Sequence, residues 1–123
     1  MLRTEDTYFF DVDAFVNIID YYIDKNDPVK ALQVIDFAQQ QHPGSFEFML
    51  RKAQLLAMVE RYQEALDILD EAEQVIPKEP DLYMIRGSIF SQQERYDMAI
   101  ESFNKAIPLA DELDMLYVNI AKI

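Results

Sequence analysis

Apolar residues recur along this chain with the three-and-four spacing of amphipathic helices. Between residues 80 and 113, one run places Tyr83, Gly87 and Phe90 on a single helix face, and a second run that begins at Tyr96 starts the spacing again in a different phase. A change of phase inside one segment is typical of two short helices and not of one long helix. The pattern therefore predicts a helical hairpin in this segment.

The same pattern returns when the sequence is shifted by 34 residues. Small and aliphatic residues then occupy equivalent positions in successive segments. The four clearest sets are Ala31, Ala65 and Ala99; Leu32, Leu66 and Ile100; Ile35, Leu69 and Phe103; and Ala38, Ala72 and Ala106. Because small side chains let two helices approach closely, we expect the alanines to lie where helices pack. A repeat of this length predicts a stack of hairpins that share a continuous core.

The repeat divides the chain into units. We predict a lead segment at 1–11, repeat 1 at 12–45, repeat 2 at 46–79, repeat 3 at 80–113, and the first helix of a partial repeat 4 at 114–123. Of several possible roles for the aromatic residues of the lead segment, Tyr8, Phe9 and Phe10, we favour packing on the first hairpin.

The period and the residue types resemble the tetratricopeptide repeat, whose pattern is W-x2-L-G-x2-Y, then A-x3-F, then P. Repeat 3 matches this pattern with Tyr83, Arg86, Gly87, Phe90, Ala99 and Phe103. Repeat 2 matches with Met49, Lys52, Ala53, Leu56, Ala65, Leu69 and Pro77, and repeat 1 with Phe15, Ile18, Ile19, Tyr22, Ala31, Ile35 and Pro43. The resemblance implies an all-α fold, a right-handed α-solenoid of antiparallel helix hairpins with about three and a third repeats. The alternative is an ordinary antiparallel helical bundle.

The chain departs from the family pattern at a few positions. Lys52 and Arg86 stand where the pattern has Leu, so we expect local deviations in the helix crossing angles. Asp111 stands where repeat 3 would have its closing proline, and Pro108 comes three residues earlier. Because a proline inside a helix removes a hydrogen bond and clashes with the preceding turn, we predict that the second helix of repeat 3 kinks or ends near Ile107.

The last residues are apolar on more than one helix face. Met115, Leu116, Val118 and Ile123 lie outside the inward positions of the predicted final helix. An apolar surface without a partner favours association. We therefore expect a fragment of a longer array, cut within its fourth unit. The alternative is a natural end covered by self-association, which would form a homo-oligomer through the C-terminal helix.

Composition narrows the classes of function. The 123 residues carry 11 Lys and Arg against 23 Asp and Glu, and this formal net charge of −12 disfavours nucleic acid and anionic lipid as partners. The chain has no cysteine, which excludes disulfides, thiolate catalysis and cysteine-ligated zinc. No apolar stretch is long enough to span a membrane, and the acidic start does not suit a secretory signal. We expect a soluble, cytoplasmic chain that is not associated with membranes.

The family resemblance implies a scaffold for protein interaction whose first helices line a concave surface. Its candidate partner-binding residues are Asp13, Val16, Asn17, Asp20, Asp24, Glu47, Leu50, Arg51, Gln54, Met58, Asp81, Met84, Ile85, Ser88, Gln92, Val118, Asn119 and Lys122. Five acids and two bases with interleaved apolar residues suit a partner that is basic and amphipathic. The alternative for the acids is that they only solvate one face. The alternative for the chain is a structural spacer or self-association module without a ligand of its own.

Catalysis and cofactor binding have little support in the sequence. His42 is the only histidine, so no Ser-His-Asp set can be assembled, and we expect it to be an exposed turn residue. Asp20 and Asp24 share a helix face, but two carboxylates without a third ligand bind a metal weakly. Some family members grip a C-terminal carboxylate with basic first-helix residues, and only Arg51 could do so here. We therefore predict no enzyme activity, no cofactor and no metal site.

Overall fold

The structure, a computed structural model, describes the chain from Phe10 to Lys122, with side chains described as far as Ala110. Over this range it consists of six α-helices without a strand. The helices are α2 (Val12–Asp24), α3 (Pro28–Gln41), α4 (Phe46–Met58), α5 (Tyr62–Val75), α6 (Pro80–Gln92) and α7 (Tyr96–Lys122). Tyr8 and Phe9 lie outside the described residues, as does most of the predicted lead segment.

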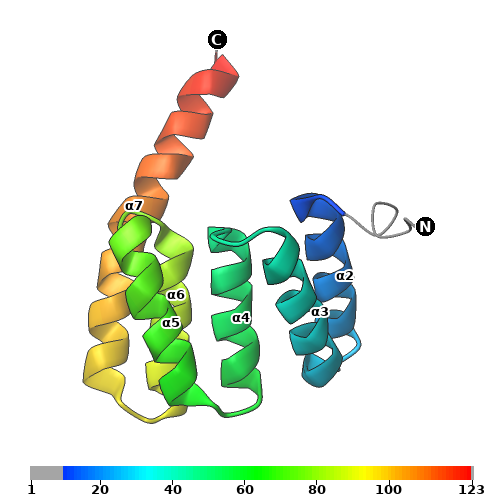
Figure 1. The fold of residues 1–123 in the computed structure, drawn as a ribbon. Helices are drawn as coiled ribbons and strands as arrows, with labels where there is room; N and C mark the ends of the chain where they lie inside the picture. The colour runs from blue at the N-terminus through cyan, green and yellow to red at the C-terminus, as the bar shows by residue number, and fades with distance from the viewer. Residues whose placement is uncertain (1–9, 123) are drawn as a thin grey trace, which may run out of the picture.

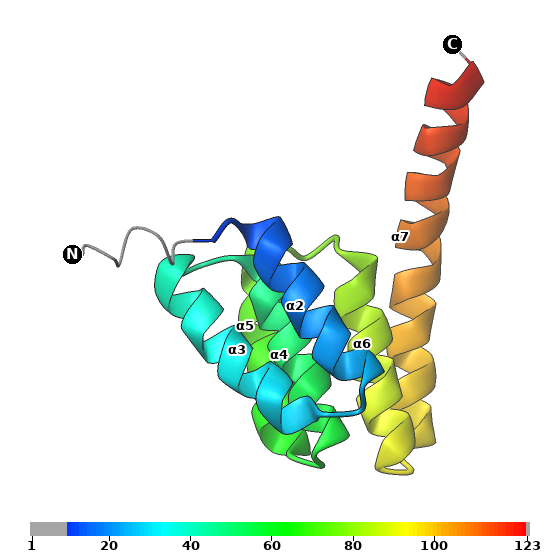
Figure 2. The same ribbon diagram turned by 90° about the vertical axis from the view of Figure 1, so that its right-hand side faces the viewer.

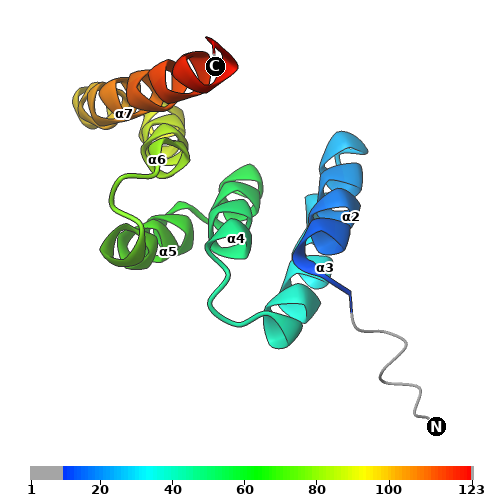
Figure 3. The same cartoon turned by 90° about the horizontal axis from the view of Figure 1, so that it is seen from above.

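Consecutive helices form three antiparallel hairpins that follow one another along a curved path (Figures 1 and 3). The pairs are α2 with α3, α4 with α5, and α6 with α7. Each first helix after α2 also packs against the preceding hairpin, through α3 with α4 and α5 with α6. The arrangement is an all-α helical-repeat solenoid, as the sequence predicts, and not a closed bundle.

The first helix of each hairpin ends in the same way. Asn26, Glu60 and Glu94 occupy equivalent positions and adopt left-handed backbone angles, with φ of 58°, 64° and 60°. The next residue then donates its N–H back to a carbonyl near the helix end, as from Arg61 to Leu56 at 2.8 Å. This Schellman arrangement satisfies carbonyls that the helix leaves free. A residue other than glycine pays a steric cost at this angle.

Replacing Glu60 with glycine is therefore expected to stabilise the fold. Glycine adopts a positive φ without the Cβ clash, so we expect the free energy of unfolding to rise by about 1 kcal/mol. Chemical denaturation followed by circular dichroism measures this change. Glu71→Gly in the middle of α5 is the matched control, where the same substitution should cost about 1 kcal/mol. Destabilisation by both variants would contradict the assignment of the turn.

Two clusters of buried side chains hold the hairpins together. The N-terminal cluster contains Phe15, Ile19, Ala31, Ile35, Ala38, Phe48 and Leu55. The C-terminal cluster contains Leu50, Ala53, Leu56, Ala57, Ala65, Leu66, Leu69, Ala72, Leu82, Tyr83, Ile89, Phe90, Ala99 and Ala106. Helix α4 contributes to both clusters and so joins the first hairpin to the rest. All six repeated alanines are buried, which confirms that they lie at helix contacts.

Ion pairs between hairpins explain the two basic departures from the family pattern. Lys52 lies 3.3 Å from Asp36, and Arg86 lies 3.0 Å from Asp70 at the equivalent place in the next junction. Arg86 also contacts Glu73 at 3.0 Å. Burial raises the pKa of Glu73, but the hydrogen bond and positive charge of Arg86 outweigh burial and leave this pKa below its ordinary value. The basic side chains therefore link consecutive hairpins.

Helix α7 differs from the sequence prediction. It continues through Pro108 to Lys122 and projects beyond the other helices (Figures 1 and 2). Of the two predicted outcomes near Ile107, a kink or a helix end, the helix end is therefore wrong, and residues 114–122 do not start a separate helix. Proline has no backbone N–H, so the carbonyl one turn before Pro108 loses its hydrogen-bond partner. Because Pro108 is exposed, water can hydrate that carbonyl instead. Without a closing proline at position 111, the helix continues.

Phe10, the first residue that the structure describes, packs on the first hairpin. The Phe10 ring lies edge-to-face with Phe15, with ring centroids 5.6 Å apart. The carbonyl of Phe10 accepts a 2.6 Å hydrogen bond from Nε2 of His42, and the backbone N–H of Phe10 donates to the Gln41 side chain. His42 is half-buried by these contacts and is not the exposed turn residue that the sequence suggested.

Candidate functional site

The first helices of the three hairpins share a hollow. It has a volume of about 330 Å³, and its lining comes from α2, α4 and α6. The lining residues are Asp20, Ile23, Glu47, Leu50, Arg51, Gln54, Asp81, Met84 and Ile85. The same face of each first helix contributes because equivalent positions repeat with the hairpin.

Charge in this hollow is organised around Arg51. Its guanidinium donates to Glu47 at 2.7 Å on the same helix and lies 3.3 Å from Asp20 on α2. Two carboxylates thus neutralise the single base, while Asp81 on α6 lines the same hollow. With three acids and one base, the hollow carries a net negative charge. We call it the acidic end of the groove.

A second hollow continues from the first between α4 and α6. It has a volume of about 270 Å³ and is lined by Gln54, Ala57, Met58, Met84, Ile85, Ser88, Ile89 and Gln92. Gln54, Met84 and Ile85 line both hollows, so the two form one continuous groove. No charged residue lines this second part among the described residues, and we call it the apolar end. Methionine side chains adapt easily to the shape of a bound apolar group.

The structure brings together most of the residues that the sequence singles out. The residues found in the groove are Asp20, Glu47, Leu50, Arg51, Gln54, Met58, Asp81, Met84, Ile85, Ser88 and Gln92. Asp13, Val16, Asn17 and Asp24 lie outside both hollows. Val118, Asn119 and Lys122 lie in α7, where the structure does not describe side chains.

Some groove residues differ from their predicted roles. Leu50 is buried in the C-terminal cluster, because hairpin stacking covers its position, so it forms part of the floor instead of an exposed contact. Ile23, Ala57 and Ile89 line the groove but were not predicted. Ile23 follows Asp20 by three positions on the same helix face, which is the signal that could have identified it.

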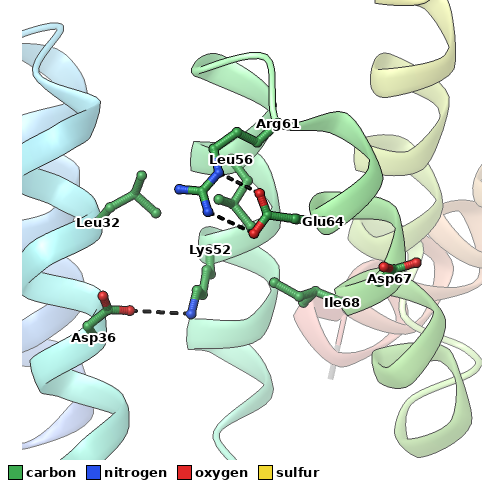
Figure 4. Close-up of a pocket in the computed structure, with 8 residues that line it drawn as sticks. All are labelled: Leu32, Asp36, Lys52, Leu56, Arg61, Glu64, Asp67 and Ile68. Atoms are coloured by element: carbon green, nitrogen blue, oxygen red, sulfur yellow. Dashed lines mark hydrogen bonds and ion pairs between the residues drawn. The ribbon is translucent and has the colours of Figure 1, made fainter.

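Another hollow, of about 340 Å³, lies among α3, α4 and α5 (Figure 4). Its apolar lining comes from Leu32, Leu56 and Ile68. Its charged residues already have partners: Lys52 contacts Asp36, Arg61 contacts Glu64, and Asp67 accepts a hydrogen bond from Gln63. A charged ligand would have to displace these contacts, so the groove is the stronger candidate site.

No group of three or more His, Cys, Asp or Glu residues in the described part of the chain is placed to hold a metal ion. No helix in that part is long and apolar enough to cross a membrane.

Comparison with protein families agrees with the hairpin geometry. A family model described as tetratricopeptide repeat matches residues 22–89, which is more than half of the chain. A second model with the same description matches residues 80–112. The chain belongs to the tetratricopeptide repeat family. No curated protein matches this tetratricopeptide chain.

Tetratricopeptide repeats generally mediate protein–protein interaction. In this tetratricopeptide protein, a clamp for a C-terminal carboxylate would need free bases in the groove. The first-helix positions that correspond to such a clamp are occupied in this chain by Val16, Asp20, Arg51, Asp81 and Ile85. Arg51 is already paired with Asp20 and Glu47. The two aspartates would repel an incoming carboxylate.

Proposed function

We propose that the groove binds a segment of a partner protein that carries a Lys or Arg side chain next to apolar side chains. The observation that carries this proposal is the continuity of the acidic and apolar ends, which share Gln54, Met84 and Ile85. A basic side chain would enter the acidic end beside Asp81, and an apolar side chain would enter the apolar end beside Met58.

The electrostatics favour a cation over an anion in this groove. Asp20 and Glu47 are both engaged by Arg51, so Asp81 is the acid that remains to meet a positively charged ligand. Asp81 is exposed and lies in the first turn of α6. Complementary charge of this kind mainly sets specificity and the rate of association. The apolar end would supply the larger share of the affinity, since apolar burial is the main favourable term in association.

Reversing the charge at Asp81 is expected to weaken capture of basic amphipathic peptides. A displayed library of random peptides is selected on the wild-type chain, and the affinities of the selected peptides are measured by fluorescence anisotropy. We expect the selected peptides to combine Lys or Arg with apolar residues. We expect Asp81→Lys to raise their dissociation constants about tenfold, which corresponds to about 1.4 kcal/mol.

Asp97→Lys is the matched control for this experiment. Asp97 is also an exposed acid in the first turn of a helix, so both variants change the net charge and the helix terminus alike. It lines neither hollow of the groove, and its substitution should leave binding within about twofold of wild type. Selected peptides without an excess of basic residues, or equal loss of binding in both variants, would overturn the proposal.

A further inference from the structure

The last hairpin exposes a surface that is buried at the junction before it. Leu66 in α5 is 8% exposed, whereas Ile100, its equivalent in α7, is 57% exposed. Leu50 in α4 is 7% exposed, and its equivalent Met84 in α6 is 48% exposed. The next hairpin covers Leu66 and Leu50. Within the described residues, nothing covers Ile100 and Met84 in the same way. The last hairpin therefore presents a surface that matches the one on which a first helix packs.

The first hairpin presents the complementary surface. Leu55 in α4 belongs to the cluster built with the first hairpin and is fully buried, as is its equivalent Ile89 in α6. Tyr21, the equivalent residue in α2, is 55% exposed. The two ends of the stack thus carry the two halves of a junction that occurs twice inside the chain.

The junction residues at the two ends also match in charge. Inside the stack, Lys52 faces Asp36 and Arg86 faces Asp70. The position equivalent to the bases in α2 is Ile18, and the position equivalent to the acids in α7 is Asn104. Both members of the ion pair are thus replaced by uncharged residues, so docking of the two ends buries no charge without a partner. If only one of them were replaced, docking would bury the other charge unpaired, which would oppose the contact.

We infer that this chain associates head to tail, with α2 of one copy packing on the outer face of α7 of another. Residues 114–122 could cover that face as the first helix of a fourth repeat, but they continue α7 away from the hairpins and leave it open (Figure 2). Because the two surfaces differ, the contact does not close on itself, and it produces linear arrays instead of dimers. The net charge of −12 opposes assembly, so salt strengthens it.

Light scattering at increasing protein concentration tests for assembly. We expect the average mass to rise without a plateau at two copies between about 10 and 500 µM in moderate salt, as for a weak contact. Ile100→Glu places a charge in the centre of the contact and should hold the protein at monomer mass. Val29→Glu is the matched control, since Val29 is similarly exposed on α3, and it should assemble like wild type. A wild-type chain that stays monomeric, or equal loss of assembly in both variants, overturns the inference.

Cross-linking identifies the occupant of the α7 face. The chain has no cysteine, so single cysteines can be introduced without background. A mixture of Ile18→Cys and Ile107→Cys chains treated with a short bis-maleimide should give a covalent two-chain product, and neither variant alone should do so. Cross-linking within the Ile107→Cys, Ile120→Cys double variant would instead show that the chain's own C-terminal residues cover the face. A product from Ile107→Cys alone would show pairing of two α7 helices. Either result overturns the head-to-tail arrangement.

Discussion

Replacing Leu69 with alanine is expected to lower the free energy of unfolding by about 3 kcal/mol. Leu69 is fully buried in the C-terminal cluster, at the position equivalent to Ile35 in the first hairpin. Its truncation removes apolar contacts and leaves a cavity between α5 and its neighbours, which the rigid helix packing fills only in part. Urea denaturation followed by circular dichroism measures the change.

Val75→Ala is the matched control for this prediction. Val75 lies on the same helix but is 69% exposed, so its truncation should change the free energy of unfolding by less than about 0.5 kcal/mol. A loss below about 1 kcal/mol for Leu69→Ala would mean that α5 is not held by this cluster.

Reversing the charge of Arg86 is expected to have a comparable effect. Arg86 is 9% exposed, and its guanidinium lies between Asp70 and Glu73, beside the ring of Tyr83. Arg86→Glu brings a third carboxylate into this confined place and removes the positive charge. We expect a loss of about 3 kcal/mol at pH 7. The partners are themselves partly exposed, so the neutral variant Arg86→Met should lose only about 1 kcal/mol.

Acid should reduce the loss in the free energy of unfolding that Arg86→Glu causes. In the wild type, Arg86 holds the pKa of Glu73 below its ordinary value of 4.5, so this pair stabilises the fold above that pH and its contribution is lost as the pH falls through the lowered pKa. In the variant, repulsion among three carboxylates disappears as they become protonated. The difference in the free energy of unfolding between the wild type and Arg86→Glu should therefore narrow below about pH 5. A difference that is independent of pH would indicate a packing defect and not an electrostatic one.

Arg95→Glu, at an exposed arginine, is the control for the charge reversal, and its free energy of unfolding should change little.

The groove was only partly predictable from the sequence. The spacing of apolar residues identifies which face of each first helix is free of the local core, so Asp81, Met84 and Gln54 could be assigned in advance. It does not show how closely successive hairpins approach. Leu50 becomes buried because the next hairpin covers it, and Arg51 becomes neutralised because Asp20, 31 residues earlier, lies beside it. Both results depend on contacts between helices that are distant in sequence.

The sequence by itself determined the repeat, the hairpins and the positions of the buried alanines. These features follow from local helix geometry and from the small side chains that close helix packing requires, so they appear as a regular spacing. Only the tertiary structure decided that Lys52 and Arg86 link hairpins through ion pairs and that α7 continues past Pro108. Those outcomes depend on solvent access and on partners from other units, which a spacing along one chain does not specify.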